Sequence, residues 1–469
     1  MKHLRRGPSQ GRRHLSSRHL WPLLAFAIGT VVIPPVCGLN NGLARQPPMG
    51  WSSWNAYKCD ISEDIIKGNA DRLIELGLRD LGYQYVVVDD CWQERNGRDE
   101  SGRIITNNKT FPSGIKPLSH YMHSHGLRFG IYSDAGKQTC QGRPGGLGYE
   151  DIDARTYAQW GVDFVKYDNC WNGFLPYLDR YGAMRDALNR TGRLMVYSTC
   201  EKHSNPWEWG ADMSNQWRIG VDLFDTWESL VRVADDGIGI AHFSGPGGWN
   251  DFDLLQVGNG GMQFQEYRAQ FAVWSIVKSP LMISTDLFKI SPRDLSTLKA
   301  RELIAVNQDP LAIAGDVVRQ QGPDIVYGGP LADGSRAAVM WNRRWHFNWP
   351  LNDCEHPSGN GTSSTPGLCG PLSVGRNMTL RFEWLGGGSE NRWPNAEHFH
   401  SDTRALVRDL YEEGDLGIFT GEVTLLVPNR GVRALRVTPV HQVQHASSTS
   451  TSNRSFRQQA SRETTEIMM

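Results

Sequence analysis

Between about residues 43 and 312 the chain alternates short apolar stretches with longer amphipathic ones. The apolar stretches predict eight β-strands, at residues 50–56, 83–89, 127–133, 163–168, 194–199, 217–222, 247–251 and 277–284. The intervening stretches have helical spacing. Ser62 is placed to cap the first helix, and residues 177–188 repeat the pattern. Eight strand–helix units over this length predict a (β/α)8 barrel, which usually takes about 250 residues.

Polar or reactive side chains stand at nearly every predicted strand end. A doubly wound sheet would also alternate strands with helices, but it gathers its chemistry at one switch point. In a barrel, the carboxyl ends of all the strands meet at one rim, which holds the active site. The rim residues are Trp51, Trp54, Asp89, Asp90, Trp92, Tyr132, Asp134, Lys166, Asp168, Cys200, Glu201, Arg218, Asp222, Trp249, Asp251 and Asp253.

The fourth predicted strand ends in Lys166 and Asp168. Side chains two residues apart on a strand point to the same side, so both should face one site. A carboxylate beside a fixed cation stays ionised at neutral pH, which suits a nucleophile. A buried structural salt bridge is the alternative interpretation. The recurrence of reactive residues at the other strand ends favours a site.

The second predicted strand ends in the adjacent residues Asp89 and Asp90. Adjacent strand residues point to opposite sides, so both face the pocket only if the strand ends there. Either could instead cap the following helix. We expect ligand contact, because carboxylates can accept hydrogen bonds from two hydroxyls of a sugar at once.

Composition excludes several classes of function. The net charge is −1, which indicates neither nucleic acid nor an anionic membrane as a partner. No His/Cys cluster has zinc-like spacing, and no phosphate loop or dinucleotide fingerprint is present. His203 and His242 are isolated and are expected to be structural or loop residues. We therefore predict neither a metal nor a cofactor. Two carboxylates can break a glycosidic bond without either, and the 17 Trp residues weakly favour carbohydrate.

The N-terminal segment predicts secretion. Five arginines precede an almost wholly apolar run at residues 20–33, which Pro34 and Pro35 end. The run is shorter than the roughly 20 residues that a membrane span needs, and small residues follow it. This pattern is typical of a cleaved signal peptide, here over residues 1–38, rather than a retained membrane anchor. The mature protein is then expected to be extracellular and free of the membrane.

Cysteines and sequons agree with secretion. Seven cysteines follow Cys37, and an odd number in a secreted protein implies one free thiol. Cys354 and Cys369 bracket a loop rich in Gly, Ser, Thr and Pro, and we expect them to pair. Glycosylation sequons begin at Asn108, Asn189, Asn360, Asn377 and Asn453.

After residue 315 the pattern becomes that of a small antiparallel β-domain. Strands are predicted at residues 324–327, 336–342, 378–384, 422–427 and 432–438, with residues 428–431 as a hairpin connection between the last two. The tail is poor in apolar residues and is expected to be disordered. The predicted organisation is a signal peptide at 1–38, a catalytic barrel at 39–314, the β-domain at 315–440 and the tail at 441–469.

Six short segments, in order along the chain, closely resemble the eukaryotic α-galactosidases of glycoside hydrolase family 27. They are PPMGWSSWN at 47–55, DDCW at 89–92, GIYSD at 130–134, KYDNC at 166–170, GGWND at 247–251 and AVNQDPL at 305–311. The resemblance runs from about residue 45 to 439. It implies a (β/α)8 barrel followed by a β-sandwich, and cleavage of terminal α-galactosides with retention of configuration.

The resemblance also implies residue roles. Asp168 would be the nucleophile. Asp222 would be the general acid and then the base for water, with the two carboxyl groups roughly 5–5.5 Å apart. The implied substrate-binding residues are Trp51, Asp89, Asp90, Tyr132, Lys166, Cys200, Arg218 and Asp253. The implied disulfides are Cys59–Cys91 and Cys140–Cys170, which leaves Cys200 as the free thiol.

Two positions depart from the family pattern. Lys202 stands where many plant and fungal members have Trp, near the 2-position of the sugar. It could donate to a hydroxyl or point to solvent. Phe252 replaces the usual Pro, which could alter the placement of Asp253.

We expect a secreted enzyme acting on galacto-oligosaccharides, galactomannan or other galactosides. The alternatives are α-N-acetylgalactosaminidase or β-L-arabinopyranosidase activity on the same fold, or a non-catalytic carbohydrate-binding protein. The sequence leaves the oligomeric state open.

Overall fold

The computed structural model describes residues 41–344, 375–387 and 393–440. Within these ranges, eight parallel strands form one sheet in the order β10-β1-β2-β5-β6-β7-β8-β9. An isolated parallel bridge between Leu255, just after β9, and Ile283 on β10 joins the two edges of the sheet. The predicted barrel is therefore confirmed. Its strands are β1 (Met49–Ser52), β2 (Tyr85–Val88), β5 (Arg128–Asp134), β6 (Phe164–Asp168), β7 (Val196–Thr199), β8 (Gln216–Arg218), β9 (Trp249–Asp251) and β10 (Leu281–Ile283).

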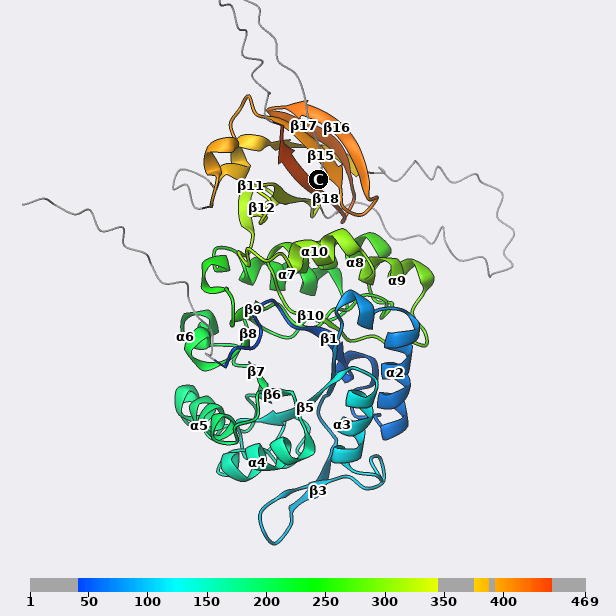
Figure 1. Cartoon of the computed structure of the whole chain (residues 1–469), viewed down its shortest axis with the longest axis vertical. Coiled ribbons are helices and arrows are strands. Elements are labelled where there is room, and N and C mark those ends of the chain that lie inside the picture. Colours follow the sequence, from blue (N-terminus) through cyan, green and yellow to red (C-terminus); the bar gives the residue numbers. More distant parts are fainter. Residues whose placement is uncertain (1–40, 345–374, 388–392, 441–469) are drawn as a thin grey trace, which may run out of the picture. The chain divides into compact units, whose positions relative to one another are not determined.

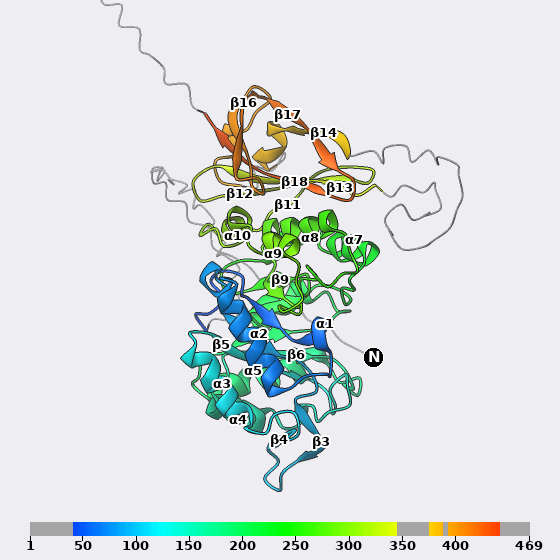
Figure 2. The same cartoon turned by 90° about the vertical axis from the view of Figure 1, so that its right-hand side faces the viewer.

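Helices surround this sheet (Figure 1). The Ser62 hydroxyl accepts a hydrogen bond from the Ile65 backbone N–H at 3.2 Å, which confirms the predicted N-cap of α2. The helices are α1 (Trp54–Tyr57), α2 (Glu63–Glu75), α3 (Ile115–Ser124), α4 (Glu150–Trp160), α5 (Tyr177–Arg190), α6 (Pro206–Met213), α7 (Trp227–Asp236), α8 (Phe264–Ile276), α9 (Pro292–Leu298) and α10 (Arg301–Asn307). A hairpin missed by the sequence pattern, β3 (Gln93–Arg98) with β4 (Ile104–Thr106), projects from the barrel (Figure 2).

The two faces of the barrel strands carry different side chains. Tyr85, Val87, Phe164, Val196 and Met282, from four strands, form one small cluster, while their strand neighbours belong to the larger core shared with the helices. Because β2, β6 and β10 are not all neighbours in the sheet, residues from all three can meet only inside the barrel. Side chains at alternate positions therefore face the interior. Continued to the carboxyl end of each strand, the same alternation decides which rim side chains face the interior.

The C-terminal strands form two antiparallel sheets. One has the order β11-β12-β13-β18-β15-β16, and the other pairs β14 with β17. Side chains of both sheets share one core, which includes Ala338, Val407 and Leu435 from the first and Leu380 and Val423 from the second. The strands are β11 (Asp316–Gln321), β12 (Asp324–Pro330), β13 (Arg336–Asn342), β14 (Gly375–Arg381), β15 (Arg404–Asp409), β16 (Gly414–Thr420), β17 (Glu422–Pro428) and β18 (Val432–Pro439).

Details of the β-domain differ from the prediction. The turn at residues 428–431 is not a hairpin connection, because β17 pairs with β14 while β18 pairs with β13 and β15. The turn instead carries the chain from one sheet to the other. The sequence pattern also missed β11, β15 and β16.

Several predictions fall outside the described residues: the signal peptide, the tail after residue 440, the Cys354–Cys369 pair, and the sequons at Asn360 and Asn453. Over the ranges that are described, no helix has the length and apolar character that a membrane span requires.

Candidate active site

Lys166 and Asp89 form the inner ion pair of the rim. Lys166 Nζ lies 2.8 Å from Asp89 Oδ2, and Asp89 is almost fully buried. Burial alone would lower the pKa of Lys166, but the charges of Asp89 and Asp168 outweigh it and raise that pKa. Lys166 is therefore a fixed cation inside the barrel mouth. Ser52, which the sequence did not indicate, lies 3.4 Å from the same Asp89 oxygen.

Asp168 lies at the end of β6 with both carboxylate oxygens engaged. One oxygen accepts from the Tyr132 hydroxyl at 3.1 Å, and the other accepts from the Asn169 backbone N–H at 2.9 Å. Lys166 Nζ lies 5.0 Å from the centre of the Tyr132 ring. Asp168 as a whole is 7% exposed. These two donors fix the orientation of the carboxylate.

Two neighbouring carboxyl groups, those of Asp90 and Asp134, are buried and less acidic. Burial raises the pKa of Asp90 to about 6 and, with the nearby charge of Asp168, raises the pKa of Asp134 to about 9. Asp90 accepts from the backbone N–H groups of Cys91 and Gln141, at 2.7 and 3.0 Å. Asp90 therefore ties two loops together, whereas Asp89 faces Lys166.

Arg218, at the end of β8, contacts several polar groups on the opposite side of the rim. Its guanidinium lies 2.9 Å from Asp253 and 3.2 Å from Asp222, and it donates to the buried thiol of Cys200 at 3.7 Å. Asp253 has a φ of 80°, a conformation that few residues other than Gly adopt. Phe252 is buried and packs edge-on against Trp274, so the core accommodates this departure from the family pattern.

Asp222 lies in the loop after β8, rather than on the predicted strand. Lys202 Nζ is 2.5 Å from Asp222 Oδ1, and 55% of the Asp222 side chain is exposed. Burial raises the pKa of Asp222, but the charges of Arg218 and Lys202 outweigh it and hold that pKa below its usual range. Lys202 therefore points at a carboxylate rather than into solvent, and its donation to a sugar hydroxyl stays a prediction.

Trp51 does not line the site. Its side chain has no exposed surface, packs in the core shared with the helices, and donates through its indole N–H to the Thr285 carbonyl at 2.9 Å. Alternation along β1 gives the interior positions to Gly50 and Ser52 and directs Trp51 outward. The expectation that Trp51 forms a pocket wall is therefore corrected.

Two disulfides, Cys59–Cys91 and Cys140–Cys170, staple the loops at the rim. Cys200 is free and buried, so these pairings match the prediction. Asp134 lies beside the second pair in a group with metal-ligand geometry. Its two cysteines are bonded to each other, so they offer no thiolates to an ion.

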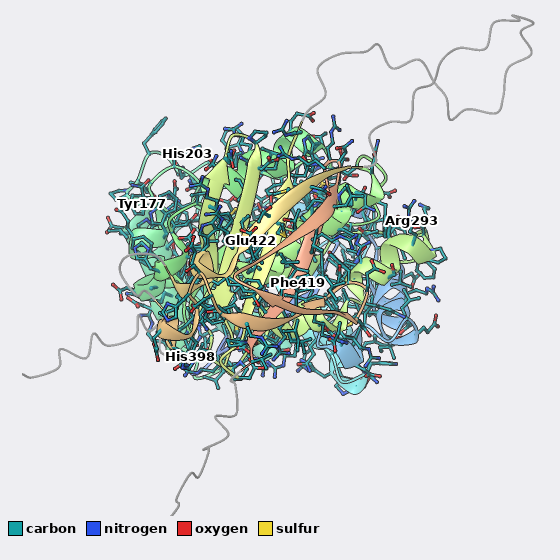
Figure 3. All side chains as sticks on the ribbon, turned by 90° about the horizontal axis from the view of Figure 1, so that it is seen from above. Tyr177, His203, Arg293, His398, Phe419 and Glu422 are labelled. Atoms are coloured by element: carbon teal, nitrogen blue, oxygen red, sulfur yellow. A yellow bond between two sulfur atoms is a disulfide. The ribbon has the colours of Figure 1, made fainter. Side chains whose placement is uncertain are left out.

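The remaining residues of interest lie on the surface. Asn108, Asn189 and Asn377 are all exposed. His203 is exposed as well and lies at the outer edge of the view in Figure 3. Its backbone N–H donates to Glu201 at 2.8 Å, so His203 belongs to a loop, as expected.

The geometry offers a buried carboxylate held by two hydrogen-bond donors and a second carboxylate at the solvent edge. Cations and fixed hydrogen-bonding groups surround both. Such a site can attack an electrophilic carbon with one group and move a proton with the other. A neutral polyol would find many donors and acceptors here.

Comparisons with known proteins identify the family. Residues 46–309 match the family described as Alpha galactosidase A. Alpha-galactosidase 3 of Arabidopsis thaliana is 48% identical over 309 residues, which are 65% of this chain and 70% of the relative. A probable alpha-galactosidase of Dictyostelium discoideum is 38% identical over 424 residues, or 89% and 99%.

A solved structure agrees. The crystal structure of alpha-galactosidase I from Mortierella vinacea superposes with a TM-score of 0.73 at 34% identity, and the match covers 85% of this chain and 98% of that one. That likeness extends through both the barrel and the C-terminal β-domain. The chain belongs to the melibiase family of α-galactosidases, glycoside hydrolase family 27.

Proposed function

We propose that this enzyme is a retaining α-galactosidase in which Asp168 is the nucleophile and Asp222 the general acid and base. The family supports the activity. The observation that carries the residue roles is the contrast between the two carboxylates. Asp168 is buried and held by the Tyr132 hydroxyl and a backbone N–H, while Asp222 stands at the solvent edge, where a leaving group departs and water enters.

The reaction then has two steps. In the first, an Asp168 oxygen bonds to the anomeric carbon, the glycosidic C–O bond breaks, and the Asp222 proton passes to the leaving oxygen. In the second, Asp222 takes a proton from water, which attacks the anomeric carbon and frees Asp168. Each step inverts the anomeric carbon, so the overall configuration is retained. A separation of roughly 5–5.5 Å between the carboxyl groups suits direct attack.

Lys202 imposes a condition on the first step. Asp222 must carry a proton to act as an acid, yet the Lys202 and Arg218 charges favour its ionised form. After the glycosyl-enzyme forms, the same charges favour Asp222 as a carboxylate, although a base of low pKa is a weak one. We infer that the enzyme works best at acidic pH.

The galactose hydroxyls are assigned to the remaining interior groups. Asp89 and Lys166 offer a buried acceptor and donor, and Arg218 and Asp253 offer another such pair. Asp90, Tyr132 and Cys200 complete the proposed substrate-binding set. Polar groups that are already fixed in place cost little further ordering when the ligand binds.

We further infer that the protein is secreted and glycosylated, and that it acts on oligosaccharides or polysaccharides. Two disulfides favour an oxidising compartment. Glycosidase treatment of secreted material tests the glycosylation, since a mass loss at Asn108, Asn189 or Asn377 is expected.

The function is tested with p-nitrophenyl α-galactoside and the Asp168→Ala variant. We expect turnover by the wild type that releases α-galactose first, as followed by NMR, and its loss in the variant. Preferred turnover of the α-N-acetylgalactosaminide or β-L-arabinopyranoside instead would contradict the proposed substrate, and initial release of β-galactose would contradict the mechanism.

A further inference from the structure

Two buried charged residues near the nucleophile, Arg180 and Glu201, take no part in the chemistry above. Arg180 is 4% exposed and Glu201 is 5% exposed. Neither side chain forms an ion pair with another of the residues that the structure describes; both are held by hydrogen bonds. Burying a charge costs free energy unless hydrogen bonds compensate for the lost water, so the contacts of the two side chains indicate their role.

Arg180 joins the loops that follow two neighbouring strands. It lies in the first turn of α5, and its guanidinium donates to the carbonyls of Ala135 and Leu175, at 3.1 and 3.0 Å. It also donates to the side-chain oxygen of Asn169 at 2.8 Å. Ala135 follows β5, whereas Asn169 and Leu175 follow β6. The planar fork of a guanidinium suits acceptors in several directions, and the compact ammonium of a lysine does not reproduce it.

The Asn169 side chain lies between the two buried charges. Its oxygen accepts from Arg180, and its nitrogen donates to the Glu201 carboxylate. The other Glu201 oxygen accepts from the His203 backbone N–H at 2.8 Å. Hydrogen bonds to charged groups are stronger than those between neutral groups. Arg180, Asn169 and Glu201, which we call the amide clamp, therefore hold both ends of the Asn169 side chain.

The amide clamp adjoins the peptide unit that holds the nucleophile. The Asn169 backbone N–H is the group that donates to the Asp168 carboxylate at 2.9 Å. The Asp168 carbonyl, on the other side of the same peptide unit, accepts from the hydroxyl of Tyr181, next to Arg180 on α5, at 3.3 Å. Because a peptide unit is planar, holding its carbonyl and the Asn169 side chain also fixes the direction of the N–H.

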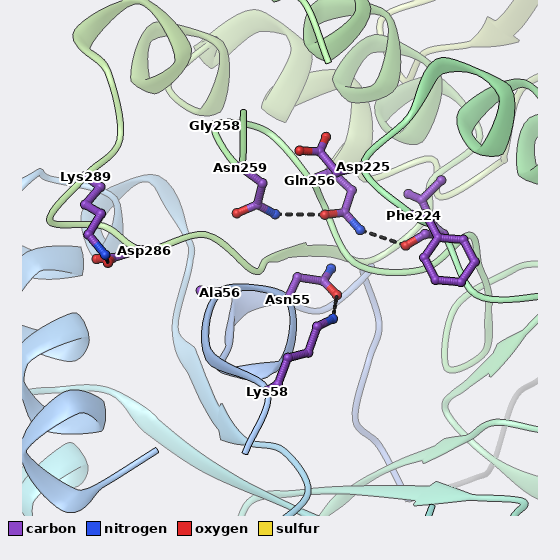
Figure 4. Close-up of a pocket in the computed structure, with 11 residues that line it drawn as sticks. Asn55, Ala56, Lys58, Phe224, Asp225, Gln256, Gly258, Asn259, Asp286 and Lys289 are labelled. Carbon is purple, nitrogen blue, oxygen red and sulfur yellow. Dashed lines mark hydrogen bonds and ion pairs between the residues drawn. The ribbon is translucent and has the colours of Figure 1, made fainter. Parts of the chain in front are cut away.

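The loop of the proposed acid has supports of its own. The carbonyl of Leu223, next to Asp222, accepts from the Gln256 side chain at 2.7 Å, and Gln256 in turn accepts from Asn259 at 2.8 Å (Figure 4). These contacts come from the segment beyond β9 and do not involve the amide clamp. A disturbance of the clamp should therefore act on the nucleophile rather than on the acid.

We propose that Arg180 and Asn169 are positioning residues for the nucleophile: the amide clamp directs the Asn169 N–H, which in turn aims the Asp168 carboxylate at the anomeric carbon. The assignment rests on the proposed function, because it takes Asp168 as the nucleophile. Attack needs the reacting atoms aligned and within about 3–3.5 Å, so a carboxylate free to turn reacts slowly. The sugar hydroxyls are assigned to other groups, so binding of galactose should not depend on the clamp.

The test separates nucleophilic attack from binding and from acid catalysis. Arg180→Lys keeps the charge without the fork, and Asn169→Ala removes the side-chain amide but keeps the backbone N–H. The substrates are melibiose, a galactosyl glucose whose leaving oxygen needs a proton, and α-galactosyl fluoride, which needs no acid. A misplacement of about 1 Å can cost about 100-fold, and since the N–H itself remains we expect roughly a tenfold fall in kcat/KM.

The fall should be equal for the two substrates, and the inhibition constant of galactose should stay at the wild-type value. An interaction that acts only in the transition state lowers the rate without weakening ground-state binding. Circular dichroism checks the fold of each variant. Asn169 is only half-buried, so Asn169→Ala carries the test if Arg180→Lys does not fold.

Arg193→Lys is the matched control. The Arg193 guanidinium also donates to two backbone carbonyls, those of Val162 and Gly161, at 2.6 and 2.9 Å. These residues precede β6, at the end of the strand opposite to Asp168. Arg193→Lys should therefore keep the wild-type kcat/KM for both substrates, whatever it does to the melting temperature.

Four results would overturn the positioning role while leaving the proposed function intact. They are an unchanged kcat/KM in the folded clamp variants, a weaker binding of galactose that accounts for the whole fall, an equal fall in Arg193→Lys, and a fall confined to melibiose, which would assign the clamp to the acid. Failure of the folded wild type to hydrolyse either substrate would instead contradict the proposed function itself.

Discussion

Lys202→Met removes one of the two cations that hold Asp222 ionised. The ammonium lies 2.5 Å from the carboxylate, and Met keeps much of the length of the side chain without its charge. A charge pair at contact in a low-dielectric site would be worth several kcal/mol, but Asp222 is more than half exposed. After solvent screening we assign the pair about 1–2 kcal/mol.

The sign of the effect follows from the role of Asp222. Cleavage needs the protonated acid, so kcat/KM falls as pH rises through the pKa of Asp222. Losing a cation raises that pKa, and 1.36 kcal/mol corresponds to one pKa unit. The basic limb of the profile should therefore move upward by about one pH unit in Lys202→Met, while Arg218 still contributes its charge.

The assay is kcat/KM for p-nitrophenyl α-galactoside across pH, with Lys202→Arg as the matched control. Arg keeps the positive charge, so its basic limb should stay with that of the wild type. α-Galactosyl fluoride needs no acid to leave, so its profile should not show the shift. A basic limb that Lys202→Met leaves in place would refute the reasoning, as would an equal shift in Lys202→Arg.

Three further predictions concern the fold. Burial and the Asp168 charge raise the pKa of Asp134 to about 9, so this carboxyl stabilises the fold fully at low pH and loses that contribution as pH rises toward 9. Between pH 5 and pH 8 the melting temperature of Asp134→Asn should fall less than that of the wild type. An equal fall in the two proteins would contradict the raised pKa assigned to Asp134. Replacing Cys59 and Cys91 by Ala removes a disulfide between residues 32 apart. The free energy of unfolding, measured in urea, should fall by about 3–4 kcal/mol. A fall below about 1 kcal/mol would contradict this prediction. Trp51→Ala should lower the free energy of unfolding by about 3–5 kcal/mol. Trp51→Phe should keep the wild-type KM, because the side chain does not line the site. A raised KM in a folded Trp51→Phe variant would show that Trp51 does form a wall of the pocket.

The barrel could be predicted because its strands are short, apolar and followed by polar residues. Period-two alternation also placed Lys166 and Asp168 on one side, and the inner cluster from Tyr85 to Met282 shows that side to be the barrel interior. The same rule, applied to β1, would have directed Trp51 to the helices. The resemblance implied a pocket position for Trp51, but the direction of its side chain is set by the alternation along β1, which buries it in the core shared with the helices.

Other features depend on contacts between segments distant in sequence. β8 ends at Arg218, and the Arg218 guanidinium donates to the carbonyls of Gly220 and Val221, at 3.3 and 2.8 Å, in the loop that contains Asp222. The Lys202–Asp222 pair joins two loops across the rim. No local pattern encodes such a contact. The turn at residues 428–431 has hairpin composition, but strand pairing across the β-domain decides its partners.

The identity of the nucleophile is tested most directly by trapping the covalent intermediate. A 5-fluoro-α-galactosyl fluoride forms the glycosyl-enzyme readily and releases it slowly, so the intact protein should gain the mass of one fluorogalactosyl group. Peptide mapping by mass spectrometry should then place that group on Asp168. Label on any other residue, or turnover without a trapped intermediate in a protein that releases β-galactose first, would contradict the account.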